Sequence, residues 1–391
     1  MRLVLDGLPL TEPLTGVGRY TYELAYALAT SSVDDLVEVV SPLPFTEPIK
    51  CAGMKPDNLL LTEARVNRLT KHWWAVGLPL YLARSEAALF HGTNFDLPFF
   101  FRGARVLTVH DLSTLLYPQT HRPHVVSRAR WRLPLMIKSA TYIIVPTSAV
   151  KREITSYLKV SSERIAIIPE APRKCFTPMP SKEAFRLLQR FQLKKNYVLF
   201  VGTIEPRKNL SRLLDAFELL VSGDKDEDLQ LVIAGRYGWM MGEFCQRLEI
   251  LKERGTVKWL GYVSDEELRA LYSACRIFIY PSLYEGFGLP LLEAMSCGAP
   301  VIAGRNSAIL ETVGEAALVI DPMDVRALSE GISILLKDES KRRSLSTVGL
   351  RRASLFTWEK TAHLTYDVYM EALKEVKSVA KKREAWRDVG E

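Results

Sequence analysis

The clearest signal of the fold is the segment Tyr280-Pro-Ser-Leu-Tyr-Glu-Gly-Phe-Gly-Leu-Pro-Leu-Leu-Glu-Ala-Met295. The apolar run that ends at Tyr280 predicts a buried strand, and the apolar residues after Pro290 predict a helix. Gly286 and Gly288 permit a tight loop between the two, and Pro290 suits the first turn of the helix. The stretch therefore predicts one strand–loop–helix unit of a parallel α/β sheet, with a helix N-terminus available to an anion.

The same alternation of short apolar runs and amphipathic segments continues through both halves of the chain, which predicts two Rossmann-like parallel sheets. The clearest helices are expected at Val17–Thr30, Ser148–Leu158 and Asp265–Cys275, the last with a Ser264/Glu267 capping box. The expected strands are Arg2–Asp6, Leu36–Val40, Ala87–His91, Arg105–Val109, Tyr142–Pro146 and Arg164–Ile168, then Tyr197–Val201, Leu229–Ala234, Val257–Leu260, Arg276–Tyr280, Pro300–Ala303 and Ala317–Ile320.

A loop-like segment from Ile168 to Pro180 contains four prolines and separates the two series of strands. It predicts one domain over residues 1–172 and a second over residues 173–357. A terminal helical region over residues 358–391 follows. Ligands of open α/β sheets bind at the carboxyl ends of the strands, so the site is expected in a cleft between the two sheets.

The composition excludes several classes of protein. Hydrophobic residues make up 48% of the 391 residues and charged residues 25%, which is typical of a soluble globular protein. The five cysteines are scattered, which argues against a disulfide framework or a zinc site. No apolar run is long enough to span a membrane, and no signal peptide is visible. We therefore expect a cytoplasmic protein.

The net charge of +7 favours anionic partners. From Leu112 to Arg152 the chain has seven Lys or Arg residues and no acidic residue, with Trp131 among them. This stretch and the apolar segment Trp73–Ala83 predict contact with an anionic membrane surface, although a solvated basic helix and a core segment explain them equally well. The aromatic and basic residues do not alternate in a pattern typical of a base-stacking platform, so nucleic acid is not expected as a partner.

Two carboxylates flank the glycine-rich loop. Glu285 precedes it and Glu293 lies one turn into the helix that follows. A carboxylate beside a phosphate site suits sugar or ribose hydroxyls, from which it accepts hydrogen bonds. The alternative is that these residues have no ligand, because acidic side chains near a helix N-terminus are also stabilised by the helix dipole alone. The paired carboxylates in this setting favour a binding site.

The segment Val201-Gly-Thr-Ile-Glu-Pro-Arg-Lys-Asn-Leu210 also lies between a strand and a helix. Gly202 leaves room for a ligand, and Arg207 and Lys208 offer cations suited to a diphosphate. Taken alone, these two bases are as readily explained as solvated loop residues.

Two further motifs lie in the first half. His110 and Asp111 end an expected strand, which puts His110 in the proposed cleft. Gly16 and Gly18 form a glycine-rich turn before a helix. The turn does not fit a dinucleotide-binding fingerprint, because Thr21 stands where the third glycine belongs and no acidic residue follows the second strand. A dehydrogenase is thereby excluded.

No metal site is predicted. Asp224-Lys-Asp226 has the form of a metal-binding Asp-x-Asp motif, but it lies in a charged loop with Glu227 and Asp228, which is typical of a solvated turn. No metal or other cofactor is therefore expected.

Together these motifs resemble the retaining family-four glycosyltransferases with the GT-B fold, of the bacterial polysaccharide and lipopolysaccharide type. The resemblance spans nearly the whole chain, and its Glu-x7-Glu segment is the most specific part. The matching segments are Glu285-Gly-Phe-Gly-Leu-Pro-x-x-Glu293, Gly202-Thr-x-Glu-Pro-Arg-Lys-Asn209, Thr15-Gly-Val-Gly-Arg-Tyr20, His110-Asp111, Glu311-Thr-Val-Gly-Glu-Ala-Ala317 and Trp358-Glu-Lys-Thr361.

The resemblance implies a role for each motif. The domain over residues 1–172 would bind the acceptor and the domain over residues 173–357 the nucleotide sugar, with the terminal helix crossing back to the first. The implied catalytic residues are His110 beside the donor sugar, Lys208 on the leaving diphosphate and Glu285 on the transferred sugar. The implied donor-binding residues are Gly16, Gly18, Gly202, Arg207, Lys208, Gly286, Phe287, Gly288, Leu289 and, on the ribose, Glu293.

The chain departs from the family pattern at two places. Many relatives carry an arginine where this chain has Thr203, and Arg207 and Arg236 are the two candidates to supply that charge. Relatives often show Pro-Asn-Gly where this chain has Pro169-Glu170-Ala171, so the segment between the domains is expected to differ.

The resemblance implies transfer of a hexose from a donor of the GDP-mannose or UDP-glucose type to a glycan or lipid-linked saccharide. The anomeric configuration would be retained and no metal used. The enzyme would be cytoplasmic, or peripheral on the inner face of the membrane. Two other interpretations stay open at this point: a sugar-nucleotide epimerase with the same nucleotide site, and a non-catalytic nucleotide-sugar-binding module.

Overall fold

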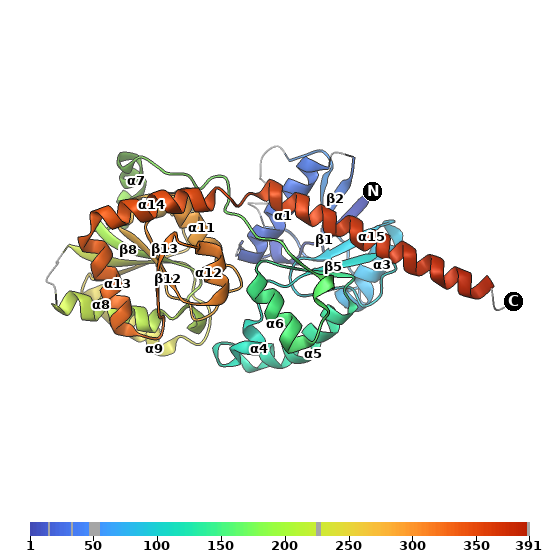
Figure 1. Ribbon diagram of the computed structural model, residues 1–391, viewed down its shortest axis with the longest axis horizontal. Helices are drawn as coiled ribbons and strands as arrows, with labels where there is room; N and C mark the ends of the chain where they lie inside the picture. The colour runs from blue at the N-terminus through green and yellow to red at the C-terminus, as the bar shows by residue number, and fades with distance from the viewer. Residues whose placement is uncertain (15, 33, 47–54, 224–227, 389–391) are drawn as a thin grey trace. The chain divides into compact units, whose positions relative to one another are not determined.

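The computed structural model describes residues 1–14, 16–32, 34–46, 55–223 and 228–388. The chain forms two compact units. Each unit is built on one parallel sheet with helices on its faces (Figure 1). The first unit comprises Met1–Asp111, Ala129–Glu170 and Thr357–Glu391, and the second comprises Leu112–Arg128 and Ala171–Phe356.

The first unit has a seven-stranded sheet in the order β3-β2-β1-β4-β5-β6-β7, and every pair in it is parallel. Its strands are short and mostly buried, as expected when helices cover both faces of a parallel sheet. The strands are β1 (Arg2–Asp6), β2 (Leu36–Ser41), β3 (Leu59–Glu63), β4 (Leu89–Gly92), β5 (Ala104–Thr108), β6 (Tyr142–Val145) and β7 (Ile165–Ile167).

The second unit has a six-stranded parallel sheet in the order β10-β9-β8-β11-β12-β13. Strands β9 and β10 are added on one side of β8, and β11 to β13 on the other side. Ligand sites of doubly wound sheets lie at the point where the strand order reverses in this way. The strands are β8 (Asn196–Val201), β9 (Leu229–Ala234), β10 (Val257–Gly261), β11 (Ile277–Tyr280), β12 (Val301–Gly304) and β13 (Ala317–Ile320).

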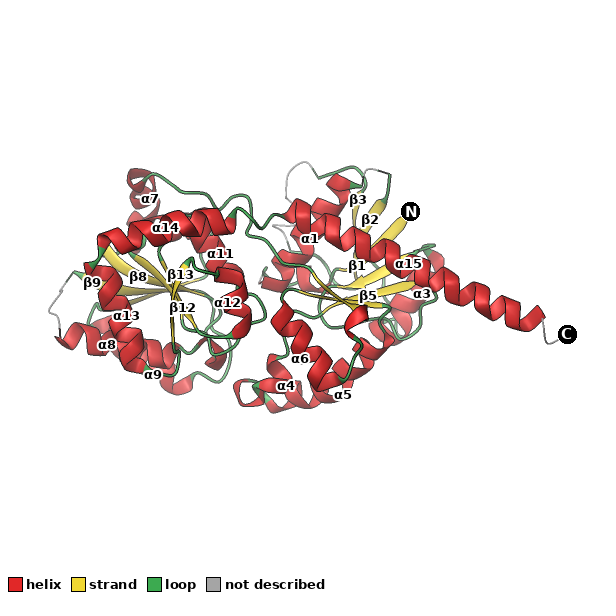
Figure 2. Cartoon of the chain, in the orientation of Figure 1, coloured by secondary structure: helices red, strands yellow, loops and turns green. Residues whose placement is uncertain are grey.

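Helices connect the strands and cover the sheets (Figure 2). Most helices are amphipathic and direct one apolar face toward a sheet. In the described residues they are α1 (Gly16–Ser31), α3 (Leu78–Arg84), α4 (Ser113–Leu116), α5 (Pro123–Ser139), α6 (Ser148–Leu158), α7 (Ser181–Leu188), α8 (Leu210–Gly223), α9 (Gly242–Glu253), α10 (Asp265–Ala274), α11 (Leu289–Ser296), α12 (Ser307–Val313), α13 (Val325–Lys337), α14 (Glu339–Ala353) and α15 (Trp358–Asp388).

The structure confirms the fold class and each predicted strand, with shifts of one or two residues at the ends. The capping box before α10 is present, because Ser264 accepts from the Glu267 backbone and the Glu267 side chain accepts from the Ser264 backbone. Strand β3 was not predicted. It is a half-exposed edge strand with only a short apolar run, and such a segment lacks the buried pattern of the central strands.

The last helix, α15, packs on α1 within the first unit. Its Tyr369 hydroxyl lies 2.6 Å from Nδ1 of His91, and its Thr361 hydroxyl donates to the carbonyl oxygen of Pro169 over 2.8 Å. These contacts bind the end of the chain to the sheet of the first unit.

Within the described part of the chain, no helix is both long and apolar enough to cross a membrane. The segment Trp73–Ala83 forms a short π-helix, η2 (Trp73–Gly77), and most of α3. Trp73, Leu78 and Leu82 are buried, whereas Leu80 is exposed. Four cysteines in the described residues are free: Cys175, Cys245, Cys275 and Cys297.

Candidate functional site

The loop after β8 brings the second predicted motif to the carboxyl edge of the sheet in the second unit. After Gly202 it forms a short 3-10 turn, η6 (Pro206–Lys208), that ends at Asn209 in a left-handed conformation with φ of 61°. The buried Asn209 side chain donates to the carbonyl oxygens of Pro281 over 3.2 Å and Pro322 over 2.6 Å. Asn209 therefore fixes this loop against the loop that follows β11.

The loop after β11 carries the stretch from which the fold was predicted. Gly288 has φ of 99° and caps α11, and a Cβ atom there would lie 2.8 Å from Leu291. Any other residue would be strained at this position. The carbonyl of Phe287 accepts from the Thr312 hydroxyl over 2.7 Å, and Pro290 lies in the first turn of α11. The N-terminus of α11 is thus at the carboxyl edge of the sheet, next to Glu285.

The two loops meet in an ionic cluster formed by Glu205, Arg207, Lys208 and Glu285. Nζ of Lys208 lies 2.6 Å from Oε1 of Glu285, and Nη1 of Arg207 lies 2.8 Å from its Oε2. Arg207 also pairs with Glu205 over 2.6 Å. The Lys208 ammonium donates a further 2.6 Å hydrogen bond to the Tyr280 hydroxyl. All four ionic side chains are largely buried, so these interactions are weakly screened by solvent.

The cluster keeps its charged groups ionised. Burial alone would raise the pKa of the Glu285 carboxyl. The positive charges of Arg207 and Lys208 outweigh this effect and lower the pKa to about 2. Burial lowers the pKa of the Lys208 ammonium, whereas the Glu285 carboxylate raises it, and the resulting pKa lies above the ordinary value for lysine. At neutral pH the site therefore presents a fixed ammonium held on a fixed carboxylate.

Glu293 lies on α11, beyond the glycine-rich loop, and has its own partners. Its Oε1 atom is 3.3 Å from Nε of Arg173, and its Oε2 atom accepts from the Tyr272 hydroxyl over 3.3 Å. Arg173 also pairs with Asp265 over 2.5 Å. Carboxylate neighbours raise the pKa of Arg173 against the effect of burial. Glu293 is thus a buried, oriented carboxylate near the N-terminus of a helix.

His110 lies in the first unit, just after β5. Its Nδ1 atom is 2.8 Å from Oε1 of Glu170, and its Nε2 atom is 2.9 Å from the carbonyl oxygen of Thr93. The Tyr20 ring meets the imidazole edge-to-face at a centroid separation of 4.8 Å. Burial lowers the pKa of His110, but the Glu170 carboxylate raises it by more, so its pKa lies above the ordinary value.

The glycine-rich turn of the first unit also begins a helix. Gly16 is the first residue of α1, and a Cβ atom there would meet no other atom within 4 Å. Gly18 is buried, and a Cβ atom there would lie 2.7 Å from the carbonyl oxygen of Pro9. Gly18 is therefore needed for the close approach of α1 to the loop after β1. Thr15 and the Asp224-Lys-Asp226 motif lie outside the described residues.

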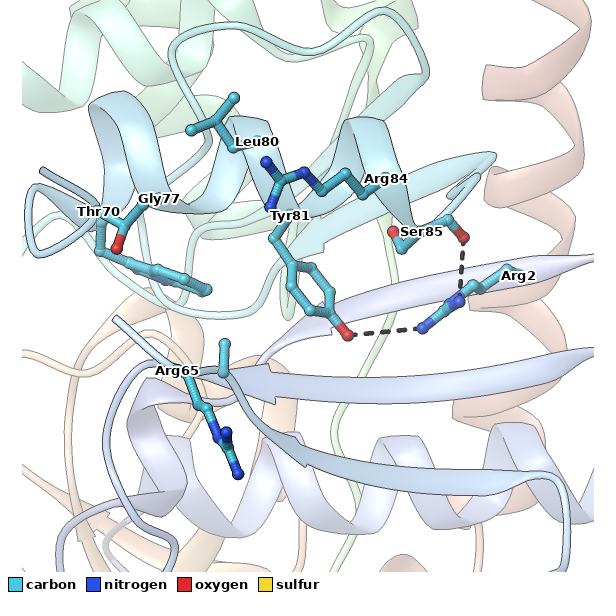
Figure 3. Close-up of a pocket in the computed structure, with 10 residues that line it drawn as sticks. Arg2, Arg65, Thr70, Gly77, Leu80, Tyr81, Arg84 and Ser85 are labelled. Atoms are coloured by element: carbon cyan, nitrogen blue, oxygen red, sulfur yellow. Dashed lines mark hydrogen bonds between the residues drawn. The ribbon is translucent and has the colours of Figure 1, made fainter. Parts of the chain in front are cut away.

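The first unit also contains a cavity of about 340 Å³ beside α3 (Figure 3). Arg2, Arg65, Trp73, Tyr81 and Arg84 are among the residues that line it. In Figure 3 the Arg2 guanidinium reaches the carbonyl oxygen of Ser85 over 3.1 Å and the Tyr81 hydroxyl over 3.5 Å. Arg2 also forms a 2.8 Å ion pair with the buried Glu38, so this charge is compensated inside the protein.

Comparison with known proteins identifies the family. The model of "Glycosyltransferase Family 4" matches residues 14–171, and the model of "Glycosyl transferases group 1" matches residues 181–351. The O-antigen chain mannosyltransferase B of Escherichia coli is 34% identical over 386 residues, which cover 94% of this chain and 99% of that one. The chain belongs to the group 1 and family 4 glycosyltransferases.

Solved structures agree with the fold of this glycosyltransferase. Sucrose-phosphate synthase from Thermosynechococcus elongatus superposes with a TM-score of 0.74 at 22% identity, over 96% of this chain and 99% of that one. Anabaena Alr3699/HepE in complex with UDP-glucose gives 0.72 at 18% identity, over 97% and 100% of the two chains. At these identities the likeness shows the GT-B architecture of two parallel-sheet domains.

Sequence reasoning missed several side chains that hold the predicted residues of this glycosyltransferase. Glu205 and Tyr280 stand inside the quoted motifs, but their contacts with Arg207 and Lys208 depend on how the two loops meet. In the sequence, Glu170 stood out only as a difference from the family's Pro-Asn-Gly pattern. In the structure its carboxylate lies within hydrogen-bonding distance of His110. Arg173 follows in the same proline-rich segment. Arg173 lies between Pro172 and Lys174, so the sequence gave no signal that it would be buried.

Proposed function

We propose that this glycosyltransferase moves a hexose from a nucleoside-diphosphate sugar to a glycan or lipid-linked saccharide, with retention of anomeric configuration and without a metal. The observation that carries the proposal is the ionic cluster of Lys208, Arg207 and Glu285 beside the N-terminus of α11. Backbone N–H groups and buried cations in one place suit a diphosphate. The curated relative is named as a mannosyltransferase, which favours mannose as the sugar and a donor of the GDP-mannose type.

Each predicted residue has a role in this proposal. Lys208 stabilises the negative charge that develops on the leaving diphosphate, because its ammonium is already fixed before the reaction. Glu285 orients both Lys208 and the hydroxyls of the sugar. Glu293 accepts hydrogen bonds from the ribose. The backbone N–H groups of residues 286–289 donate to the sugar or the diphosphate. Gly16, Gly18 and Gly202 are further proposed donor-binding positions, where the backbone can lie close to the donor.

The proposed reaction breaks the bond between the anomeric carbon and the diphosphate oxygen and forms a bond from that carbon to an acceptor hydroxyl oxygen. The proton of the acceptor hydroxyl passes to an oxygen of the leaving diphosphate. In this single displacement, which forms no covalent glycosyl-enzyme, retention requires the acceptor to attack on the side from which the diphosphate leaves. His110, whose pKa Glu170 raises, is assigned to the donor sugar near its reacting end.

Two measurements test the proposal. In thermal unfolding, GDP-mannose and UDP-glucose are compared with the free sugars, and a bound donor at about 100 times its Kd adds about 2.7 kcal/mol to the free energy of unfolding. In proton NMR of the first product, an α-linked donor must give an α-linked product. A β-linked product would refute retention. Release of nucleoside diphosphate without any acceptor dependence would favour an epimerase or hydrolase instead.

A peripheral position on an anionic membrane is also part of the proposal. Helix α5 exposes Arg130, Trp131, Leu135 and Lys138 in the acid-free part of the sequence. Exposed aromatic and basic side chains on one helix suit a membrane interface. A cytoplasmic enzyme with such a face would meet lipid-linked acceptors at the inner surface of the membrane.

A further inference from the structure

The ionic cluster places the Lys208 ammonium in the site but carries no net charge. Lys208 and Arg207 carry two positive charges, and Glu205 and Glu285 carry two negative ones. The low pKa of Glu285 means that its carboxylate stays charged at neutral pH. Arg207 is held further by a 2.8 Å hydrogen bond to the carbonyl oxygen of Tyr284. An anionic donor therefore needs a cation that the protein has not already neutralised.

Arg236 is such a cation, and it lies at the same edge of the same sheet. It follows β9, and its guanidinium lies over the ring of Tyr262 at 4.6 Å from the centroid. Among the described residues Arg236 has no carboxylate partner, although it is only partly exposed. Stacking uses the face of the guanidinium and leaves its edge N–H groups available as donors.

The strand register places Arg236 beside Thr203. Val201 pairs with Ala234 at the ends of β8 and β9, and Ile204 pairs with Tyr237 beyond them, in the same parallel register. The backbone N–H of Ile204 donates to the carbonyl oxygen of Arg236 over 2.8 Å. Position 236 is therefore level with position 203, just beyond the ends of the two strands.

We propose that Arg236 binds the diphosphate of the donor, supplying from the end of β9 the positive charge that Thr203 lacks, and that Tyr262 holds its guanidinium in place. The assignment rests on the proposed function. Arg236 is preferred to Arg207 as the ligand of the diphosphate, because Arg207 already forms ion pairs with Glu205 and Glu285. Tyr262 follows β10 and is 53% exposed, so its ring supports Arg236 at the surface where a ligand arrives.

The test is isothermal titration of the full chain with GDP, UDP and inorganic pyrophosphate. Arg236→Gln is expected to weaken binding of the preferred nucleoside diphosphate by about ten- to a hundredfold, the usual range for one charged hydrogen-bonding partner. Binding of the corresponding nucleoside, which has no phosphate, should not change. Arg254→Gln is the matched control, because Arg254 is exposed and precedes β10 at the opposite edge of the sheet.

A second variant moves the charge instead of removing it. Thr203→Arg combined with Arg236→Gln should recover most of the lost affinity, because position 203 is level with position 236. A merely structural role for Arg236 would not be rescued in this way. Tyr262→Leu should weaken binding less than Arg236→Gln does.

The outcomes separate this inference from the proposed function. Unchanged binding of nucleoside diphosphate by Arg236→Gln would refute the role of Arg236 alone. Equal losses for the nucleoside and the nucleoside diphosphate would also refute it, because the contact would then be to the base. If the wild-type chain bound none of these ligands, the proposed function itself would be refuted.

Discussion

Nδ1 of His110 lies 2.8 Å from Oε1 of Glu170, while Nε2 of the same ring faces the carbonyl oxygen of Thr93 at 2.9 Å. An ionised carboxylate and a carbonyl can only accept hydrogen bonds. Both contacts are therefore satisfied at once only when the ring carries a proton on each nitrogen. Glu170 thus favours the cationic form of His110, in agreement with the raised pKa of this histidine.

Glu170→Gln is expected to lower the pKa of His110, because the neutral amide no longer compensates the burial of the charged ring. Heteronuclear NMR titration measures this pKa directly, and His110→Gln assigns the signal among the six histidines. Glu163→Gln is the control, since Glu163 is exposed on a nearby turn. An unchanged His110 pKa in Glu170→Gln would show that the pair does not hold the charge.

The same pair predicts the pH dependence of stability. A raised pKa in the folded state means that the pair stabilises the fold fully below the unfolded pKa of about 6.5 and that this contribution is lost as the pH rises through the folded pKa. Melting temperatures from pH 6 upward should therefore fall more for the wild type than for Glu170→Gln. Parallel curves for the two proteins would contradict the prediction.

Lys208→Ala should reduce turnover by about 10²–10³ while changing donor affinity much less, because the charge on the diphosphate grows in the transition state. Glu285 keeps Arg207 as a partner in this variant, so the loop should stay folded. Steady-state kinetics separate kcat from KM, and thermal unfolding checks the fold. Lys341→Ala, at an exposed position on α14, serves as the control. A wild-type kcat would remove Lys208 from the chemistry.

Glu293→Gln should weaken binding of both the donor and the free nucleoside diphosphate, with little effect on kcat, because ribose contacts are present before and during the reaction. Arg173 keeps Asp265 as a partner, which limits the structural damage. Calorimetric titration measures the affinity, with Glu266→Gln on the exposed face of α10 as the control. If kcat falls and affinity does not, Glu293 belongs to the reacting sugar instead of the ribose.

Transferase activity should persist in excess EDTA. The proposed stabilisers of the diphosphate are Lys208, Arg236 and the N-terminus of α11, all supplied by the protein. Among the described residues, no group of three or more His, Cys, Asp or Glu side chains is placed to hold a metal. The measurement is the initial rate before and after chelation. Loss of activity that Mg²⁺ or Mn²⁺ restores would overturn this prediction.

The protein should float with liposomes that contain anionic lipid at low salt, and not with neutral ones. Each basic residue near such a surface contributes about 1 kcal/mol. The double variant Arg130→Glu and Lys138→Glu should reduce the floated fraction, whereas Lys341→Glu on α14 should not. Absence of the wild-type protein from the anionic liposome fraction would leave α5 as a solvated basic helix.

The two-sheet fold and the loops that carry the candidate site could be predicted from the sequence alone. Alternating apolar and amphipathic segments have few stable arrangements other than parallel sheets covered by helices. Glycine and proline at fixed positions around Gly288 and Pro290 marked the loop and the helix start. These signals are local, so neighbouring residues suffice to read them. The edge strand β3 was not predicted, because much of it is exposed to solvent and it lacks a fully apolar pattern.

The pairing of the charged side chains became visible only in the folded chain. Lys208 and Glu285 are 77 residues apart, and His110 and Glu170 are 60 apart, so no local pattern links them. Arg207 and Arg236 were both candidates in the sequence. The strand register and the ion pairs of Arg207 favour Arg236, because Glu285, one of the two carboxylates paired with Arg207, comes from another loop of the sheet.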